Sequence, residues 1–155
     1  MSRYLKVETE FNDLTMFESA LQTTCAKLGI EFEHHTKPTN LIGYQGDTRP
    51  ETAHYIVRRR HIGGSCNDLG FRVQPDGTVT AVISEFDNDT TYGTDSRGIG
   101  VLNAVKQEYA LQKVTQMAKR RGLEVEQVEE NGVIRLRLRK KAASRRNNRR
   151  VSVRR

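Results

Sequence analysis

The stretch that decides the fold is Leu69-Gly-Phe-Arg-Val-Gln-Pro-Asp-Gly-Thr-Val-Thr-Ala-Val-Ile83. At its centre, Pro75-Asp76-Gly77 is typical of a turn, because proline pre-sets φ and glycine accepts the positive φ that tight turns require. Pairing Gln74 with Thr78 places the larger apolar side chains on one face and mostly polar or small side chains on the other. The apolar pairs are Val73 with Val79, Phe71 with Ala81, and Leu69 with Ile83. This register predicts an antiparallel hairpin with one face in a core.

A second hairpin is predicted near the C-terminus, where Glu130-Asn131-Gly132-Val133 carries the Asn-Gly signature of a two-residue turn. Its register sets Val125 opposite Leu138, Glu126 opposite Arg137, and Glu124 opposite Arg139. Alternation along the last strand predicts that Ile134, Leu136 and Leu138 point inward and that Arg135, Arg137 and Arg139 point outward. We interpret the arginines as a surface ion-pair ladder, in which each exposed pair is worth ~0–1 kcal/mol.

Two helices and three further strands complete the prediction. Apolar residues recur at helical spacing after residue 12, and a second apolar helical face runs from about Ile99 to Arg121. The first stripe consists of Leu14, Phe17, Leu21, Cys25 and Leu28, in which we interpret Cys25 as a core residue. Residues 5–11, 30–35 and 53–62 are predicted strands. The order β-α-β-β-β-β-α-β-β predicts an α+β fold, an antiparallel sheet with two helices packed on one face.

Long polar loops are expected at residues 36–50 and 86–98, and loops of this length are often functional. The strand at 53–62 carries Arg58-Arg59-Arg60, which we expect to be a solvated edge. A loop containing Cys66 is expected to be exposed.

The net charge of +7 is unevenly distributed. Residues 139–155 hold nine basic side chains and no acidic one, whereas residues 1–138 have a net charge of −2. We therefore expect one α+β domain over 1–138 and a disordered basic tail over 139–155. The candidate polyanion-binding residues of the tail are Arg139, Lys140, Lys141, Arg145, Arg146, Arg149, Arg150, Arg154 and Arg155.

Several classes of protein are disfavoured. No apolar run has the length of a membrane span, and the first residues lack the apolar core of a secretory signal, so we expect a cytoplasmic protein without a membrane partner. The acidic residues of the 86–98 loop resemble a calcium loop that starts at Asp87. Counted from there, Gly93 is seventh and Gly98 twelfth, whereas a calcium loop has glycine at its sixth position and glutamate at its twelfth. We predict no metal site, no cofactor and no catalytic residues.

Four segments together resemble the domain-of-unknown-function family numbered twelve fifty-seven, which includes hypothetical chloroplast frame thirty-five. They are Gly43-Tyr44-Gln45-Gly46, Pro75-Asp76-Gly77-Thr78, Gln107-Glu108-Tyr109-Ala110-Leu111-Gln112-Lys113-Val114, and Gly132-Val133-Ile134-Arg135-Leu136. The family has no established activity, and some members are encoded near AAA-type ATPases. The resemblance therefore implies an accessory or assembly role, with an AAA-type ATPase as a partner.

Two functional hypotheses follow. The first is a non-enzymatic accessory or binding protein whose tail contacts RNA, the ribosome or an acidic protein surface, and whose two loops meet a protein partner. Its candidate partner-binding residues are Gly43, Tyr44, Gly46, Arg49, Asp87, Tyr92, Asp95 and Arg97. The alternative is an enzyme or small-ligand-binding protein that uses the same loops through Tyr44, Arg49, Asp87 and Asp95.

Overall fold

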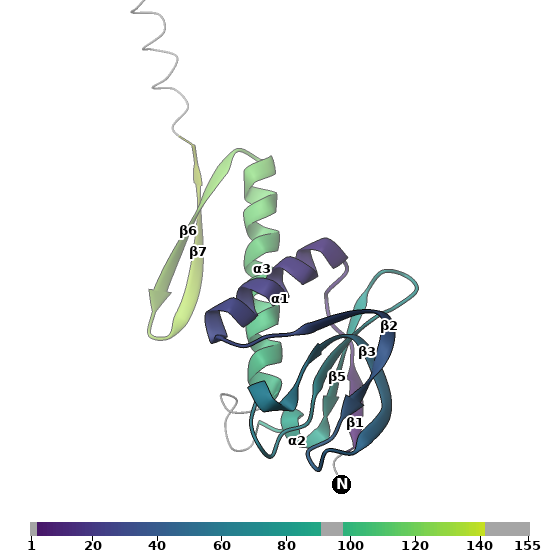
Figure 1. Ribbon diagram of the computed structural model, residues 1–155. Helices are drawn as coiled ribbons and strands as arrows, with labels where there is room; N and C mark the ends of the chain where they lie inside the picture. Colours follow the sequence, from purple (N-terminus) through teal and green to yellow (C-terminus); the bar gives the residue numbers. More distant parts are fainter. Residues whose placement is uncertain (1–2, 91–97, 142–155) are drawn as a thin grey trace, which may run out of the picture. The chain divides into compact units, whose positions relative to one another are not determined.

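A computed structural model describes residues 3–90 and 98–141 of the chain (Figure 1). Its contacts divide the chain into two compact units, Met1–Ala110 and Leu111–Arg155, which we call the N-terminal unit and the C-terminal unit. The elements are β1 (Tyr4–Val7), α1 (Leu14–Leu28), β2 (Glu33–Ile42), β3 (Thr48–Val57), the 3-10 helix η1 (Arg59–His61), β4 (Leu69–Val73), β5 (Val79–Ser84), α2 (Glu85–Asn88), α3 (Gly98–Arg120), β6 (Leu123–Glu130) and β7 (Val133–Lys140).

The predicted α+β class and the β-α-β-β-β-β-α-β-β order are confirmed, with α2 and η1 as additional short elements. The strands form two antiparallel sheets rather than the single sheet that we expected. One has five strands in the order β1-β5-β4-β3-β2, and the other consists of β6 and β7 alone. The large sheet lies in the N-terminal unit and the small sheet in the C-terminal unit.

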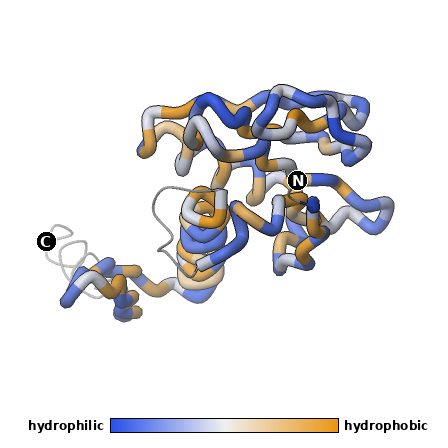
Figure 2. Tube along the Cα trace, turned by 90° about the horizontal axis from the view of Figure 1, so that it is seen from below, coloured by the Kyte–Doolittle hydropathy of each residue, from blue (hydrophilic) through white to orange (hydrophobic). Residues whose placement is uncertain are grey.

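The core of the N-terminal unit lies between one face of the five-stranded sheet and the two helices, as predicted. Phe17 of α1 is fully buried, and its ring centroid lies 5.1 Å from that of Phe71 and 5.3 Å from that of Tyr55. The first turns of α3 add Leu102 and Tyr109 to this cluster. Figure 2 shows the alternating polar and apolar residues along the chain that this arrangement requires.

Helix α1 begins where Asp13 accepts a hydrogen bond from the backbone N–H of Met16 at 3.0 Å, which satisfies one unpaired helix donor. The helix ends at Gly29, whose φ of 67° suits glycine. Cys25 is buried, as predicted, and burial raises the pKa of its thiol to about 11. The predicted stripe is too long at both ends, because Leu14 and Leu28 are exposed.

The predicted 36–50 loop is wrong, since most of these residues belong to the hairpin of β2 and β3. Pro38 is accommodated on the edge strand β2, where the register shifts between His34 and Thr39. Pro50 lies on β3 before the part that pairs with β4, which begins at Tyr55. The predicted 53–62 strand is displaced, because β3 ends at Val57 and η1 follows.

The hairpin of β4 and β5 has the predicted register, with Val73 opposite Val79 and Phe71 opposite Ala81. The opposite face of the same sheet carries a second, smaller apolar cluster of Tyr4, Leu41, Ala53, Ile56 and Val82. Gly70 lies beneath this cluster, and a Cβ atom there would lie 2.7 Å from the Cβ atom of Ala53 and 3.1 Å from the methyl carbons of Leu41. The hairpin therefore requires a residue without a side chain at this position.

In the C-terminal unit, the predicted register is confirmed at every pair, including Glu126 with Arg137 and Glu124 with Arg139. The turn carries positive φ angles at Asn131 (53°) and Gly132 (75°), as a two-residue hairpin turn requires. The ion pairs run diagonally across the ladder rather than straight across it, from Arg139 to Glu126 at 3.7 Å and from Arg135 to Glu130 at 3.9 Å.

The prediction that Ile134 and Leu138 point into a core is wrong, because they are 37% and 45% exposed. Since β6 and β7 form a sheet of their own, they do not share the core of the larger sheet. None of the helices within residues 3–90 and 98–141 is long and apolar enough to cross a membrane.

We expect Gly70→Ala to lower the free energy of unfolding by about 1–3 kcal/mol, because the added methyl group overpacks the cluster. Gly64→Ala is the matched control, since a Cβ atom there meets nothing within 4 Å. Urea unfolding of the two variants measures the difference. Equal stability of the two variants would show that the sheet tolerates a side chain at residue 70.

Candidate functional site

Two consecutive polar residues, Asn67 and Asp68, lie just before β4 and are each 1% exposed. We call this pair the Asn67–Asp68 node. Buried polar groups are retained in folded proteins when they are hydrogen-bonded. The hydrogen bonds of the node therefore show which segments of the chain its side chains hold together.

Asp68 bonds to groups from several elements of the N-terminal unit. Its Oδ2 atom accepts hydrogen bonds from the backbone N–H of Ile42 at 2.8 Å and from the guanidinium of Arg58 at 2.7 Å. Its Oδ1 atom accepts from the backbone N–H of Arg59 at 2.7 Å, and its carbonyl accepts from the hydroxyl of Tyr4 at 2.7 Å. Asp68 thereby ties β1, the end of β2 and the chain after β3 to the start of β4.

Arg58 also forms a two-pronged ion pair with Glu33 on β2, with N–O distances of 2.8 and 2.9 Å. The hydrogen bond from Arg58 is the main cause that lowers the pKa of Glu33 to about 2, with a smaller contribution from His35. The same ion pair raises the pKa of Arg58. Arg58 therefore stays charged and links β2, through Glu33, to the start of β4, through Asp68.

The guanidinium of Arg59 binds backbone carbonyls rather than acidic side chains. Its guanidinium donates to the carbonyls of Cys66 at 3.0 Å, Tyr44 at 2.7 Å and Gly64 at 2.5 Å. The solvated edge expected for Arg58-Arg59-Arg60 is thus wrong for the first two residues, whereas Arg60 is exposed. The expected exposure of Cys66 is also wrong, because Cys66 is buried beside this contact.

The Asn67 side chain joins the two segments that we predicted to be functional loops. Its Oδ1 atom accepts a hydrogen bond from the backbone N–H of Tyr44 at 2.9 Å. Its backbone N–H donates to Oδ2 of Asp87 at 2.9 Å, and Ser84 donates to the same oxygen at 2.6 Å. The described parts of the two segments therefore meet at Asn67, and their polar groups form hydrogen bonds within the fold.

The predicted partner-binding residues fall into three groups. Gly43, Tyr44 and Gly46 form the tight turn between β2 and β3, in which Gly46 has a φ of 80°. Asp87 is buried in α2, and Arg49 is enclosed with a side chain 12% exposed. Tyr92, Asp95 and Arg97 lie outside the described residues.

Arg49 lies between two acidic side chains and an aromatic ring. Its guanidinium is 3.7 Å from Asp47 and 4.0 Å from Glu51, and its central carbon lies 5.4 Å from the centre of the Tyr4 ring. Burial raises the pKa of Tyr4, so its hydroxyl remains a donor to Asp68. Arg49 thus has a packing role inside the N-terminal unit.

The predicted basic tail begins within regular structure. Arg139 and Lys140 end strand β7, and Lys141 follows. The remaining candidates, Arg145, Arg146, Arg149, Arg150, Arg154 and Arg155, lie outside the described residues.

The boundary between the two units separates the charge more sharply than the predicted tail does. Residues 1–110 contain 11 basic and 15 acidic side chains, a net charge of −4. Residues 111–155 contain 15 basic and 4 acidic side chains, a net charge of +11. The excess of positive charge therefore begins within α3 and continues through the β6–β7 hairpin.

Residues 3–90 and 98–141 contain no candidate metal centre. No group of three or more His, Cys, Asp and Glu side chains is arranged there to hold a metal ion. His54 of β3 accepts a hydrogen bond from the backbone N–H of Val73 at 3.0 Å. Burial and the nearby Arg72 lower its pKa, which favours the neutral ring that can accept this bond.

The fold and charge together define a small α+β protein with an acidic N-terminal unit and a basic C-terminal unit. The chain belongs to the family described as "Protein of unknown function (DUF1257)", whose model matches residues 24–137. This confirms the resemblance found in the sequence. No curated protein and no solved structure matches the chain.

Sequence reasoning missed Arg58, Arg59, Asn67, Asp68 and Ser84. Their partners are separated from them by up to 64 residues, as in the bond from Tyr4 to Asp68. One local signal was present, because adjacent Asn and Asp residues often cap turns and strand ends. Nothing local, however, indicated that Asp68 is buried.

We expect Asp68→Asn to destabilise the N-terminal unit by about 3 kcal/mol, because it leaves the half-buried Arg58 without one of its two carboxylates. Glu85→Gln makes the same chemical change in the exposed pair with Arg3 and should cost less than ~1 kcal/mol. Denaturant unfolding of both variants gives the comparison. The proposed role of Asp68 fails if the two substitutions cost the same.

A pH dependence follows from Glu33. Because its pKa is lower in the folded chain than in the unfolded one, its contribution is present above about pH 4.5 and is lost as the pH falls toward about 2. The side chain is 36% exposed, so solvent screening limits the contribution to ~1 kcal/mol. The stability gap between the natural chain and Glu33→Gln should therefore close between these pH values. A gap as large at pH 2 as at pH 7 would exclude this ion pair as its cause.

Proposed function

We propose that the chain is a small, non-enzymatic binding protein whose C-terminal unit docks on a polyanion, namely RNA or the ribosome. The observation that carries the proposal is the charge of +11 on residues 111–155 beside −4 on residues 1–110. A cationic unit attracts phosphate backbones, whereas an acidic one is repelled by them. The contact is therefore expected through one end of the chain.

The described part of the C-terminal unit supports the proposal through the placement of its cations. Lys119 and Arg120 lie in the last turn of α3, and three arginines alternate along β7. The ion pairs of Arg135 and Arg139 are exposed and near 4 Å, so a phosphate can replace the glutamates at low cost.

The mode of binding follows from composition. Residues 111–155 contain no Phe, Tyr or Trp, the side chains on which single-stranded bases stack. Contacts to the phosphate backbone should therefore dominate, with little dependence on base sequence and a steep dependence on salt.

The non-enzymatic part of the proposal is supported by the internal use of polar groups at the Asn67–Asp68 node. The node bonds to the backbone of Tyr44 and to Asp87, two of the four residues named for the alternative enzyme hypothesis. An accessory role is what the family resemblance implies. Its implied AAA-type ATPase partner stays a prediction.

Fluorescence anisotropy with a labelled single-stranded RNA, recorded across a salt series, tests this proposal. If nine cations neutralise phosphates, the slope of log K against log salt is about −6. Replacing the six arginines from Arg145 to Arg155 with glutamine should make the slope about 4 less negative.

The matched control replaces six cations of the N-terminal unit, so that both variants have the same net charge. These are Arg3, Lys6, Lys27, Lys37, Arg60 and Lys106. We expect this control to bind RNA nearly as well as the natural chain. Equal loss of binding in the two variants would reduce the effect to net charge and contradict docking through the C-terminal unit.

A further inference from the structure

The hairpin of β6 and β7 has two faces of different chemistry. Residues directly opposite one another in an antiparallel pair point to the same side, so the register assigns every side chain to one face or the other. One face carries the ion pairs of Arg135 and Arg139 with glutamates. The other, which we call the apolar hairpin face, carries Leu123, Val125, Ile134, Leu136 and Leu138.

The apolar hairpin face is not buried within its own chain. No residue from Leu123 to Lys140 is buried, and the side chains of Ile134 and Leu138 are exposed. A two-stranded hairpin is only marginally stable in water unless further strands or a helix cover its apolar side. This face therefore offers apolar surface that a partner can bury.

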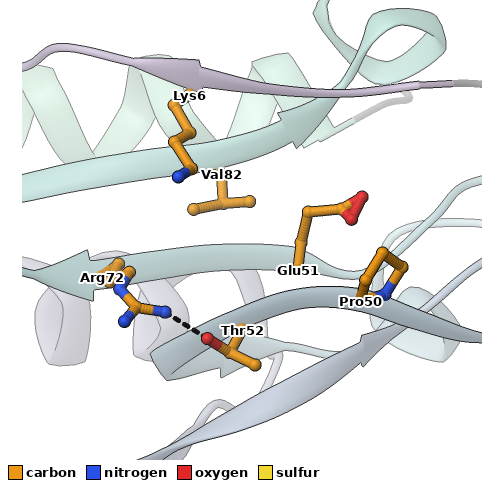
Figure 3. Close-up of a pocket in the computed structure, with 6 residues that line it drawn as sticks. All are labelled: Lys6, Pro50, Glu51, Thr52, Arg72 and Val82. Atoms are coloured by element: carbon orange, nitrogen blue, oxygen red, sulfur yellow. Dashed lines mark hydrogen bonds between the residues drawn. The ribbon is translucent and has the colours of Figure 1, made fainter.

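The five-stranded sheet differs in this respect, because both of its faces carry buried apolar clusters. A hollow of about 220 Å³ opens on the face opposite α1, but Val82 in its lining is only 1% exposed, and Arg72 there donates a hydrogen bond to the hydroxyl of Thr52 (Figure 3). Six large apolar side chains are exposed in the described part of the chain, and four of them lie in the C-terminal unit. These four are Met117, Val133, Ile134 and Leu138.

Two opposite charges border the apolar hairpin face. Glu129 lies on it next to the turn, opposite Ile134, and Lys140 lies on it at the open end, opposite Leu123. They are about 20 Å apart along the strands, which is too far for them to pair with each other. The ion pairs that the hairpin forms among the described residues lie on its other face and use neither of them.

This arrangement of charges is complementary to itself. If a second copy lies face to face with its strands reversed, a two-fold axis brings Glu129 of each copy to Lys140 of the other. The same operation sets the apolar side chains of one copy against those of the other. A second copy of the chain therefore matches the face in both apolar character and charge.

From this self-complementarity we infer that two copies of the chain form a symmetric dimer through their apolar hairpin faces. Each strand has eight residues, so the face is about 27 Å long and about 10 Å wide. An interface of this size is at the low end of specific ones, and we expect a dissociation constant in the micromolar range. The arginines of β7 remain on the outer faces, and the dimer does not depend on the polyanion contact proposed above.

The test is sedimentation equilibrium of the full chain without RNA, from about 5 to about 500 µM protein at about 0.15 M salt. We expect a monomer–dimer equilibrium for the natural chain. Glu129→Lys and Lys140→Glu should each weaken association at least tenfold, because like charges then meet at both ends of the interface. An equimolar mixture of the two variants should recover it, because each variant supplies the charge that the other lacks.

Arg137→Glu is the matched control, since it makes the same change of charge as Lys140→Glu on the other face of the hairpin. It should associate as the natural chain does. All three substitutions are at exposed positions, so the variants are expected to fold. A natural chain that stays monomeric would leave this face to a different protein and overturn the inference. A mixture that associates no better than its components, or equal weakening by Arg137→Glu, would also overturn it.

Discussion

The burial of Asp68 is the constraint on which the N-terminal unit depends. A carboxylate whose side chain is fully shielded from solvent must have its charge and both oxygens satisfied. Asp68 meets this requirement through Arg58 and the backbone N–H groups of Ile42 and Arg59. Because these partners come from different segments, the carboxylate can be buried only when β2, the end of β3 and β4 are all in place. The node thus couples local structure to the topology of the sheet.

The same constraint explains why residues of the predicted loops are hydrogen-bonded within the fold. Tyr44 and Asp87 were predicted to face a partner, but Asn67 draws both toward the interior through its side-chain oxygen and backbone N–H. Polar residues that cluster in sequence can therefore serve the fold rather than a ligand.

Sequence reasoning succeeded where the pattern was local and periodic. The registers of residues 69–83 and of the β6–β7 hairpin followed from a turn motif and a two-residue alternation, both of which act over a few residues. It failed at β2 and β3, where Pro38 and Pro50 suggested a loop but an edge position and a register shift accommodate them. Local sequence patterns could not predict the Asn67–Asp68 node, because its hydrogen bonds join residues that are 9 to 64 positions apart in the chain.

The division into two units also changes where the positive charge of the chain begins. The sequence suggested a boundary at residue 139, at the start of a segment with nine basic side chains and no acidic one, whereas the contacts divide the chain at residue 110. Cations at the end of α3 and along β7 consequently belong with the tail, and the remaining residues are more acidic than expected. The polar groups of the Asn67–Asp68 node are bonded within the first unit, and the docking that we propose uses cations of the second.

The most direct test of this division is the footprint of a single-stranded RNA on the amide resonances of the full chain. The account predicts that the shifted amides lie within residues 111–155, while those of the sheet and of the Asn67–Asp68 node keep their positions. Shifts concentrated within residues 3–90 would contradict it, since the acidic unit would then be the one that binds.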